Sequence, residues 1–237
     1  MADAHHAGPV HALAVHPSCG TTGAGPPLGG GGGGVLVASG GDDCRVHVAA
    51  LGSGGGHSFS SGAVAAAVRT RHRVTSLAWA CAAPADGGDW QHAPASGNGA
   101  QLLVGQEDGA LAAYDLRALR LEPPAAAAAA GGDARRVHVP VFRLPGHRAG
   151  VRSLAVGWAC GSGGRGAPTL LCASGGDDGV VRLASLQPEA PWLGLQRVAA
   201  HQDCVRALAW ASPSGGAGPG ALLSGGWDGA VLEHCVR

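Results

Sequence analysis

Closely spaced cysteines, long apolar runs and a secretory signal are all missing from this chain of 237 residues. Its seven cysteines are scattered without a C-x-x-C pair, which argues against a disulfide framework and a structural zinc site. No apolar run approaches the ~20 residues of a membrane-spanning helix, and Met1–Pro9 lacks the basic and apolar parts of a signal peptide. We therefore expect an intracellular protein of the cytoplasm or nucleus, with reduced thiols and no membrane partner.

Net charge is also absent, because 16 basic residues balance 16 acidic ones. A surface without excess positive charge argues against a nucleic-acid or anionic-membrane partner. The densest basic spot is residues 69–73, where three arginines accompany His72. A solvated turn before a strand is favoured there over a phosphate site.

Aromatic residues make up only 4% of the chain, whereas glycines number 43 and prolines 15. The short runs between the glycine-rich stretches are rich in Val and Leu, which is typical of β-strands. The longest alanine run, Ala125–Ala130, is bounded by prolines and glycines and is too short to hold a helix alone. This composition predicts an all-β fold.

One unit occurs four times: a short apolar strand, an insertion, a strand of small residues and a turn built around an aspartate. The units cover roughly residues 6–51, 70–120, 147–187 and 201–237. Stretches of Gly, Ala, Pro and Ser bury little apolar area, so they are predicted to be linkers. These are residues 19–34, 52–62, 81–100, 122–136, 157–168 and 211–220. The whole chain, 1–237, is predicted to be a single repeat domain.

Motifs for catalysis or cofactor binding do not emerge. Twelve histidines invite a metal hypothesis, but no carboxylate–histidine spacing recurs around them, so no metal ligand is predicted. Gly29–Gly34 lacks the Lys-Ser/Thr of a phosphate-binding loop. A Ser-His-Asp hydrolase is disfavoured because no serine occupies a Gly-x-Ser-x-Gly turn. We expect no cofactor and no catalytic residue.

The third and fourth repeats carry a recognisable pattern. The third starts at His147, continues through a small-residue strand at 170–175 and turns at Asp178. The fourth starts at His201 and turns at Asp228. This pattern resembles a WD40 repeat, the blade of a β-propeller. The resemblance implies an all-β, WD40-type β-propeller of about four blades.

The resemblance also implies a structural network in each blade. In the family, the histidine at the blade start hydrogen-bonds with the turn aspartate and locks a loop against the third strand. In the second repeat the turn aspartate is Asp108, but Thr70 stands in the histidine position. A satisfied pair of this kind is worth about 1.5–3 kcal/mol. Carried onto this chain, the pairs are His6 with Asp43, His147 with Asp178, and His201 with Asp228.

Departures from the family concern the end of each blade. The family often ends its third strand with Trp-Asp, but Ala49, Ala184 and His234 stand there in the first, third and fourth repeats. Only the second repeat keeps an aromatic–acid pair, Tyr114-Asp115. The fourth repeat leaves room for a third strand and no fourth. Because a closed ring hides its sheet edges, we expect an open arc or a piece of a longer propeller.

The Tyr114-Asp115-Leu116-Arg117 segment resembles the Trp-Asp-x-Arg box of WD40 proteins that dock on the damaged-DNA-binding adaptor of cullin-4 ubiquitin ligases. In that family the arginine lies on one rim, where its planar fork reaches carboxylates or carbonyls of the adaptor. Arg117 would be the contact and Asp115 would hold the turn. The alternative is that Tyr114 packs between blades and the segment simply completes a strand.

The sequence thus favours a non-catalytic scaffold for protein partners. The resemblance implies a substrate receptor for a cullin-4 type ubiquitin ligase. A general WD40 assembly platform, in a complex unrelated to ubiquitin, is the alternative, and an enzyme ranks third.

Overall fold

The structure is a computed structural model that describes residues 6–16, 34–52, 64–80, 101–115, 140–159, 169–186, 196–211 and 221–235. These residues form fifteen β-strands and contain no helix, so the predicted all-β fold is confirmed. Within the same ranges, therefore, no helix has the length and apolarity needed to cross a membrane.

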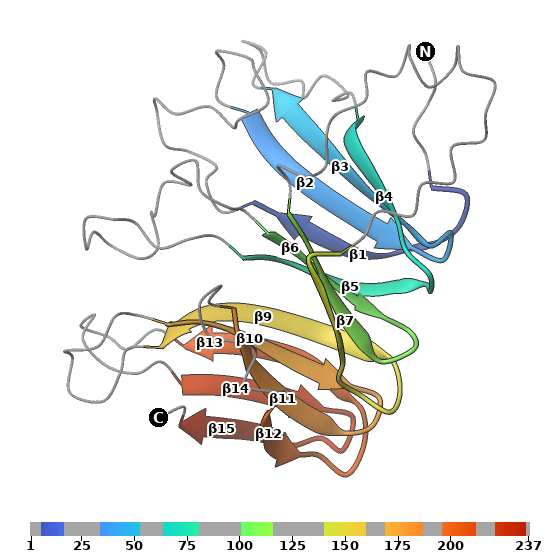
Figure 1. Cartoon of the computed structure of the whole chain (residues 1–237). Helices are drawn as coiled ribbons and strands as arrows, with labels where there is room; N and C mark the ends of the chain where they lie inside the picture. The colour runs from blue at the N-terminus through green and yellow to red at the C-terminus, as the bar shows by residue number, and fades with distance from the viewer. Residues whose placement is uncertain are drawn as a thin grey trace, which may run out of the picture. The chain divides into compact units, whose positions relative to one another are not determined.

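The strands form four sheets, one for each sequence repeat (Figure 1). The first sheet contains β1 (Val10–Val15), β2 (Gly34–Gly41), β3 (Arg45–Gly52) and β4 (Val64–Arg69). The second contains β5 (Val74–Ala80), β6 (Gln101–Gln106), β7 (Ala110–Asp115) and β8 (Phe142–Pro145). The third contains β9 (Val151–Ala159), β10 (Thr169–Gly176), β11 (Val180–Ser185) and β12 (Gln196–Ala200). The fourth contains β13 (Val205–Ala211), β14 (Ala221–Gly226) and β15 (Val231–Cys235).

The predicted first and second strands of every repeat occur where the apolar runs indicated. The outer strand of the second repeat, β8, covers Phe142–Pro145; residues 140 and 141 precede it outside any strand, and residues 137–139 lie outside the described ranges. β9 continues to Ala159, beyond the predicted start of a linker at Gly157. The predicted linkers lie outside the described ranges apart from a few residues at their ends.

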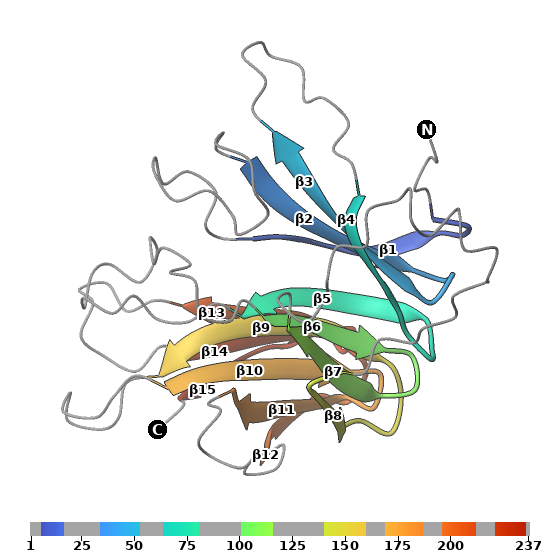
Figure 2. The ribbon, with the colours of Figure 1, turned by 45° about the horizontal axis from the view of Figure 1, so that its top comes forward.

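The chain divides into two compact units: Met1–Leu102 with Ala113–Val141, and Leu103–Ala112 with Phe142–Arg237. In the first unit, β5 packs against β1 and β2. In the second, β13 packs against β9 and β10 (Figure 2). A Cβ atom on Gly175 would lie 2.4 Å from Cγ1 of Val205, so only glycine allows β10 to approach β13 this closely.

The turn after the second strand of each repeat needs one residue in the left-handed conformation. Glycine adopts this conformation without steric cost, and three repeats use it. The first repeat places a cysteine there instead. The φ angles are 55° at Cys44, 83° at Gly109, 71° at Gly179 and 76° at Gly229.

The carbonyl groups of the first three of these turn residues accept backbone hydrogen bonds that position the start of the following repeat. The N–H groups of Thr70, His147 and His201 donate to the carbonyl oxygens of Cys44, Gly109 and Gly179, over 2.9, 3.0 and 2.7 Å. The turn of one repeat therefore fixes the position that carries the histidine of the next.

Candidate functional site

A buried trio of histidine, aspartate and serine lies in the third repeat. His147 precedes β9, Ser174 is on β10 and Asp178 is in the turn that follows β10. His147 Nδ1 lies 2.8 Å from Asp178 Oδ1, and Nε2 lies 3.0 Å from Ser174 Oγ. Because an ionised carboxylate only accepts hydrogen bonds, Nδ1–H donates to Asp178, and Nε2 accepts from the Ser174 hydroxyl.

Electrostatics keep the imidazole of this trio neutral beside a charged carboxylate. Burial alone would raise the pKa of Asp178, but the hydrogen bonds from His147 and from the Arg148 and Val180 N–H groups lower it below its ordinary value. Burial lowers the pKa of His147, and this outweighs the opposing effect of Asp178. The trio is therefore a satisfied structural network.

The first and fourth repeats contain the same trio. His6 Nδ1 lies 3.0 Å from both Asp43 oxygens, and Nε2 lies 2.9 Å from Ser39 Oγ. His201 Nδ1 lies 3.1 Å from both Asp228 oxygens, and Nε2 lies 2.8 Å from Ser224 Oγ. The structure thus brings together all three histidine–aspartate pairs that the resemblance implied.

The hydrogen bonds connect serine to histidine and histidine to aspartate, as they do in the catalytic triad of a hydrolase. A nucleophilic serine must reach its substrate. Ser174 and Ser224 are 0% and 1% exposed, so a substrate cannot reach either hydroxyl. The trio of the third and fourth repeats stabilises the fold instead.

The second repeat lacks the trio. Thr70 donates its hydroxyl hydrogen to the carbonyl of His72, over 2.7 Å. Asp108 accepts hydrogen bonds from the Ala110 N–H group and from the Arg143 guanidinium of β8. The turn aspartate therefore holds the outer strand of its own sheet.

The fourth repeat extends its trio through His234, a role that the sequence pattern did not indicate. His234 is on β15, is buried, and its Nε2 lies 2.8 Å from Ser224 Oγ. Since Ser224 donates to His201, its oxygen accepts the hydrogen on His234 Nε2. His234 occupies the position where the family often has tryptophan, and both side chains carry an N–H donor.

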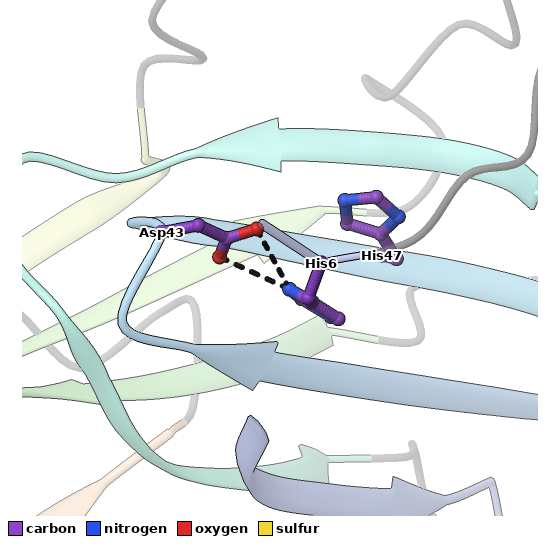
Figure 3. Close-up of side chains that lie close together, drawn as sticks. All are labelled: His6, Asp43 and His47. Carbon is purple, nitrogen blue, oxygen red and sulfur yellow. Dashed lines mark hydrogen bonds and ion pairs between the residues drawn. The ribbon is translucent and has the colours of Figure 1, made fainter. Parts of the chain in front are cut away.

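The first repeat also adds a second histidine. His6, Asp43 and His47 each offer one donor atom, and these atoms lie within 4.8 Å of one another (Figure 3). The spacing of these residues along the chain gave no metal signature. Within the described ranges, these three residues form a group of histidine and carboxylate side chains that could hold a metal ion.

The structure describes only the first two residues of the Tyr114-Asp115-Leu116-Arg117 segment, which resembles the adaptor-docking box. Tyr114 is 3% exposed on β7, and Asp115 ends that strand half-buried. Arg117 lies outside the described residues. The burial of Tyr114 agrees with packing in the sheet, and the contact role assigned to Arg117 stays a prediction.

A set of surface pairs recurs beside the trios. In the first and third repeats, the aspartate that precedes the turn aspartate is hydrogen-bonded to the side chain of the second residue of the first strand. His11 Nε2 lies 2.7 Å from Asp42 Oδ1, and Arg152 Nε lies 2.7 Å from Asp177 Oδ1. The hydrogen bond from Arg152 lowers the pKa of Asp177 below its ordinary value.

The fourth repeat replaces the acid of this pair with an aromatic residue. Trp227 is 65% exposed, and Arg206 Cζ lies 4.7 Å from the centroid of its ring. The arrangement is a cation–π pair on the surface. Cys204 connects the two pairs, because its thiol lies 3.8 Å from the Asp177 carbonyl oxygen and its own carbonyl accepts a hydrogen bond from the Trp227 N–H group, over 3.0 Å.

Three cysteines of the described residues, Cys44, Cys172 and Cys204, are free thiols. Burial raises the pKa of Cys172 to about 12, so this thiol stays protonated and unreactive. Cys172 acts as a small hydrophobic residue in β10.

Comparison with protein families matches residues 138–184 to the WD domain, G-beta repeat. The matched segment contains the His147–Asp178–Ser174 trio. With the four sheets, this match supports the WD40 family and confirms the WD40-type β-propeller fold class with about four blades. WD40 repeats indicate a scaffold for protein interaction. A comparison with curated proteins gave no match.

Two solved structures are similar in fold. The computationally designed Ika4 protein has a TM-score of 0.54 and 16% identity, covering 99% of this chain and 95% of that chain. A humanized mutant of the Chaetomium thermophilum Polycomb Repressive Complex 2 bound to the inhibitor GSK126 has a TM-score of 0.59 and 15% identity, covering 96% of this chain and 38% of that chain. Such low identities show the fold alone.

Proposed function

We propose that the chain is a non-catalytic scaffold that binds a protein partner through a rim surface made of Arg152, Asp177, Arg206 and Trp227. The exposed Trp227 carries the proposal. Aromatic residues are only 4% of the chain, yet this one is 65% exposed. Tryptophan and arginine are the residues that most often dominate the energy of protein interfaces.

The rim surface offers defined chemistry to a peptide. Arg206 lies over the Trp227 ring, which orders its guanidinium while its N–H groups can donate to a carboxylate or carbonyl. The Arg152–Asp177 ion pair next to it supplies donors and acceptors of fixed geometry. A partner segment that carries an acidic side chain fits this arrangement.

Affinity capture from a cell extract tests the proposal with the tagged chain, a Trp227→Ala variant and a Val231→Ala control. Val231 is on the same sheet and is 74% exposed, so it matches the exposure of Trp227. A specific partner should be retained by the chain and by the control, and reduced roughly tenfold or more by Trp227→Ala. Equal recovery of every retained protein by the Trp227→Ala variant would contradict the proposal.

A narrower proposal identifies the partner. The Tyr114–Arg117 segment resembles the cullin-4 adaptor-docking box, and its position in the second repeat is similar to that in WD repeat-containing protein 53. On this proposal the chain is a substrate receptor for a cullin-4 type ubiquitin ligase, with Arg117 as the contact. Its location would then be the cytoplasm or nucleus, in keeping with the free thiols of the described residues.

The narrower proposal has its own test. The damaged-DNA-binding adaptor should be captured by the chain and by an Arg71→Ala control, which changes an exposed arginine elsewhere, but not by Arg117→Ala. Absence of the adaptor from all three captures, with the chain shown to be folded, would overturn the ligase assignment. This result would not affect the general scaffold proposal, which the Trp227→Ala variant tests separately.

A further inference from the structure

We propose that His6, Asp43 and His47 of the first repeat form a binding site for one divalent transition-metal ion of the zinc(II) class. Strand pairing creates the group. In the register of β2 and β3, His47 lies opposite Ser39, and Ser39 is the residue that bonds His6 Nε2. The pairing therefore places the second imidazole beside the first.

The geometry brings the three side chains close together. The ring centroids of His6 and His47 lie 4.3 Å apart, with 40° between the planes. The Asp43 carboxylate faces the His6 ring (Figure 3). All three are nearly buried, since the side chains of His6 and Asp43 are 8% and 5% exposed and His47 is 6% exposed. Low exposure strengthens the attraction between a carboxylate and a cation.

The ligand set matches one chemical class. Two imidazole nitrogens and one carboxylate oxygen suit zinc(II), cobalt(II) or nickel(II) rather than magnesium or calcium, which prefer oxygen. Zinc–nitrogen bonds of about 2.0–2.1 Å require the donor atoms to move closer than they are here. His6 lies in the segment before β1, so a small rotation of its side chain can achieve this.

Metal binding to His6 Nδ1 requires a change of tautomer, with no net loss of a proton. At present Nδ1–H donates to Asp43, over 3.0 Å. When the metal takes the Nδ1 lone pair, the Nδ1 proton leaves to solvent and Nε2 takes up a proton from solvent, so the ring stays neutral with its hydrogen on Nε2. Nε2–H can then donate to Ser39 Oγ at 2.9 Å, which orients the ligand.

Two backbone N–H groups hold the Asp43 carboxylate in a position from which it can bind a metal ion. Its Oδ2 accepts the Ala7 N–H group and its Oδ1 accepts the Arg45 N–H group, both over 3.1 Å. Each oxygen of an ionised carboxylate has a second lone pair. The backbone donors can therefore hold the carboxylate in place while one oxygen binds the ion.

The third and fourth repeats serve as internal controls, because each has the trio but no histidine opposite its serine. The trio therefore needs no metal ion to form. In the third repeat, Arg182 stands opposite Ser174, where the first repeat has His47. In the fourth, Leu232 stands opposite Ser224. A His47→Arg variant thus installs a residue that the same backbone position already accepts beside an intact trio.

The test uses the full chain and cobalt(II), whose visible absorption reports its ligands, with zinc(II) in calorimetry. We expect one cobalt(II) per chain, binding weakened roughly tenfold or more by His47→Arg, and binding unchanged by His11→Gln. His11 is a matched control because it is an exposed histidine that bonds a carboxylate in the same sheet. Equal binding by the chain and His47→Arg would overturn the proposal, as would no binding by the chain.

A second measurement keeps the proposal testable if His47→Arg does not fold. Cobalt(II) broadens the nuclear magnetic resonance signals of nearby protons. Addition of one equivalent to the native chain should broaden the imidazole signals of His6 and His47 first. Broadening confined to other histidines would contradict the site.

Discussion

The first and fourth repeats contain the same trio, and each adds a second histidine in a different place. His47 lies opposite the serine of its trio, whereas His234 lies one strand period further along, opposite Leu222. One period of a strand is roughly 6.8 Å. This shift puts the extra imidazole beside the carboxylate in the first repeat and on the serine in the fourth. The same residue type therefore creates a candidate metal site in one repeat and a longer hydrogen-bond chain in the other.

The largest expected effect comes from removing the central imidazole. His201→Ala should lower the free energy of unfolding by about 3 kcal/mol, because it leaves Ser224, Asp228 and His234 with incomplete hydrogen bonds in a buried place. His6→Ala should cost about 2 kcal/mol, since the side chain is 8% exposed against 0% for His201. Urea denaturation measures both values, and a larger cost for His6→Ala would contradict the comparison.

Acid should weaken the extended chain of the fourth repeat. Burial lowers the pKa of His234 from its ordinary 6.5, as it does for His147 and His16, so the unfolded chain binds these protons at higher pH than the folded chain. Their contribution to stability is complete above about pH 6.5 and is lost as the pH falls. Below about pH 6.5, each such histidine lowers the free energy of unfolding by at most about 1.4 kcal/mol for each unit by which the pH falls.

A His234→Trp variant isolates the contribution of this one group. Its indole N–H can donate to Ser224 but does not titrate. Thermal melting at about pH 7.5 and about pH 5.5 should show a smaller acid-induced loss of Tm in the variant than in the native chain. An unchanged loss would show that His234 does not contribute. Below this range, Asp228 with a pKa of about 2 adds stability that disappears only as its carboxylate is protonated.

The smallest expected effect concerns the turn next to each trio. Cys44 has a φ angle of 55°, where a side chain is strained by about 1–2 kcal/mol, so Cys44→Gly should stabilise the chain by about 1 kcal/mol. Gly229→Cys should destabilise it by about as much, because a Cβ there meets no atom within 4 Å and only backbone strain remains. Equal melting temperatures for the native chain and both variants would contradict this account of the turn.

Much of the fold could be predicted because its signals are local. The apolar runs and the aspartate turns recur in every repeat, and the His147–Asp178 pair occurs in a motif that resembles a known family. Ser224–His234 and His6–His47 could not be predicted in the same way. Ser224–His234 is a diagonal contact across a hairpin, and His6–His47 joins the segment before β1 to β3, so each depends on how the strands assemble and on the direction of the side chains. The cation–π pair likewise joins Arg206 of β13 to Trp227 in the turn after β14.

By itself, the sequence determined the all-β class and the four repeats, because strand periodicity and turn chemistry depend on neighbouring residues. The resemblance to WD40 repeats implied the three histidine–aspartate pairs, and the structure added the serine of each trio. Only the tertiary structure decided what the extra histidines do. Strand register placed His47 beside His6 and His234 against Ser224, and sheet packing buried both. Burial and register are properties of the assembled sheets, so the chemistry of these imidazoles exists only in the folded chain.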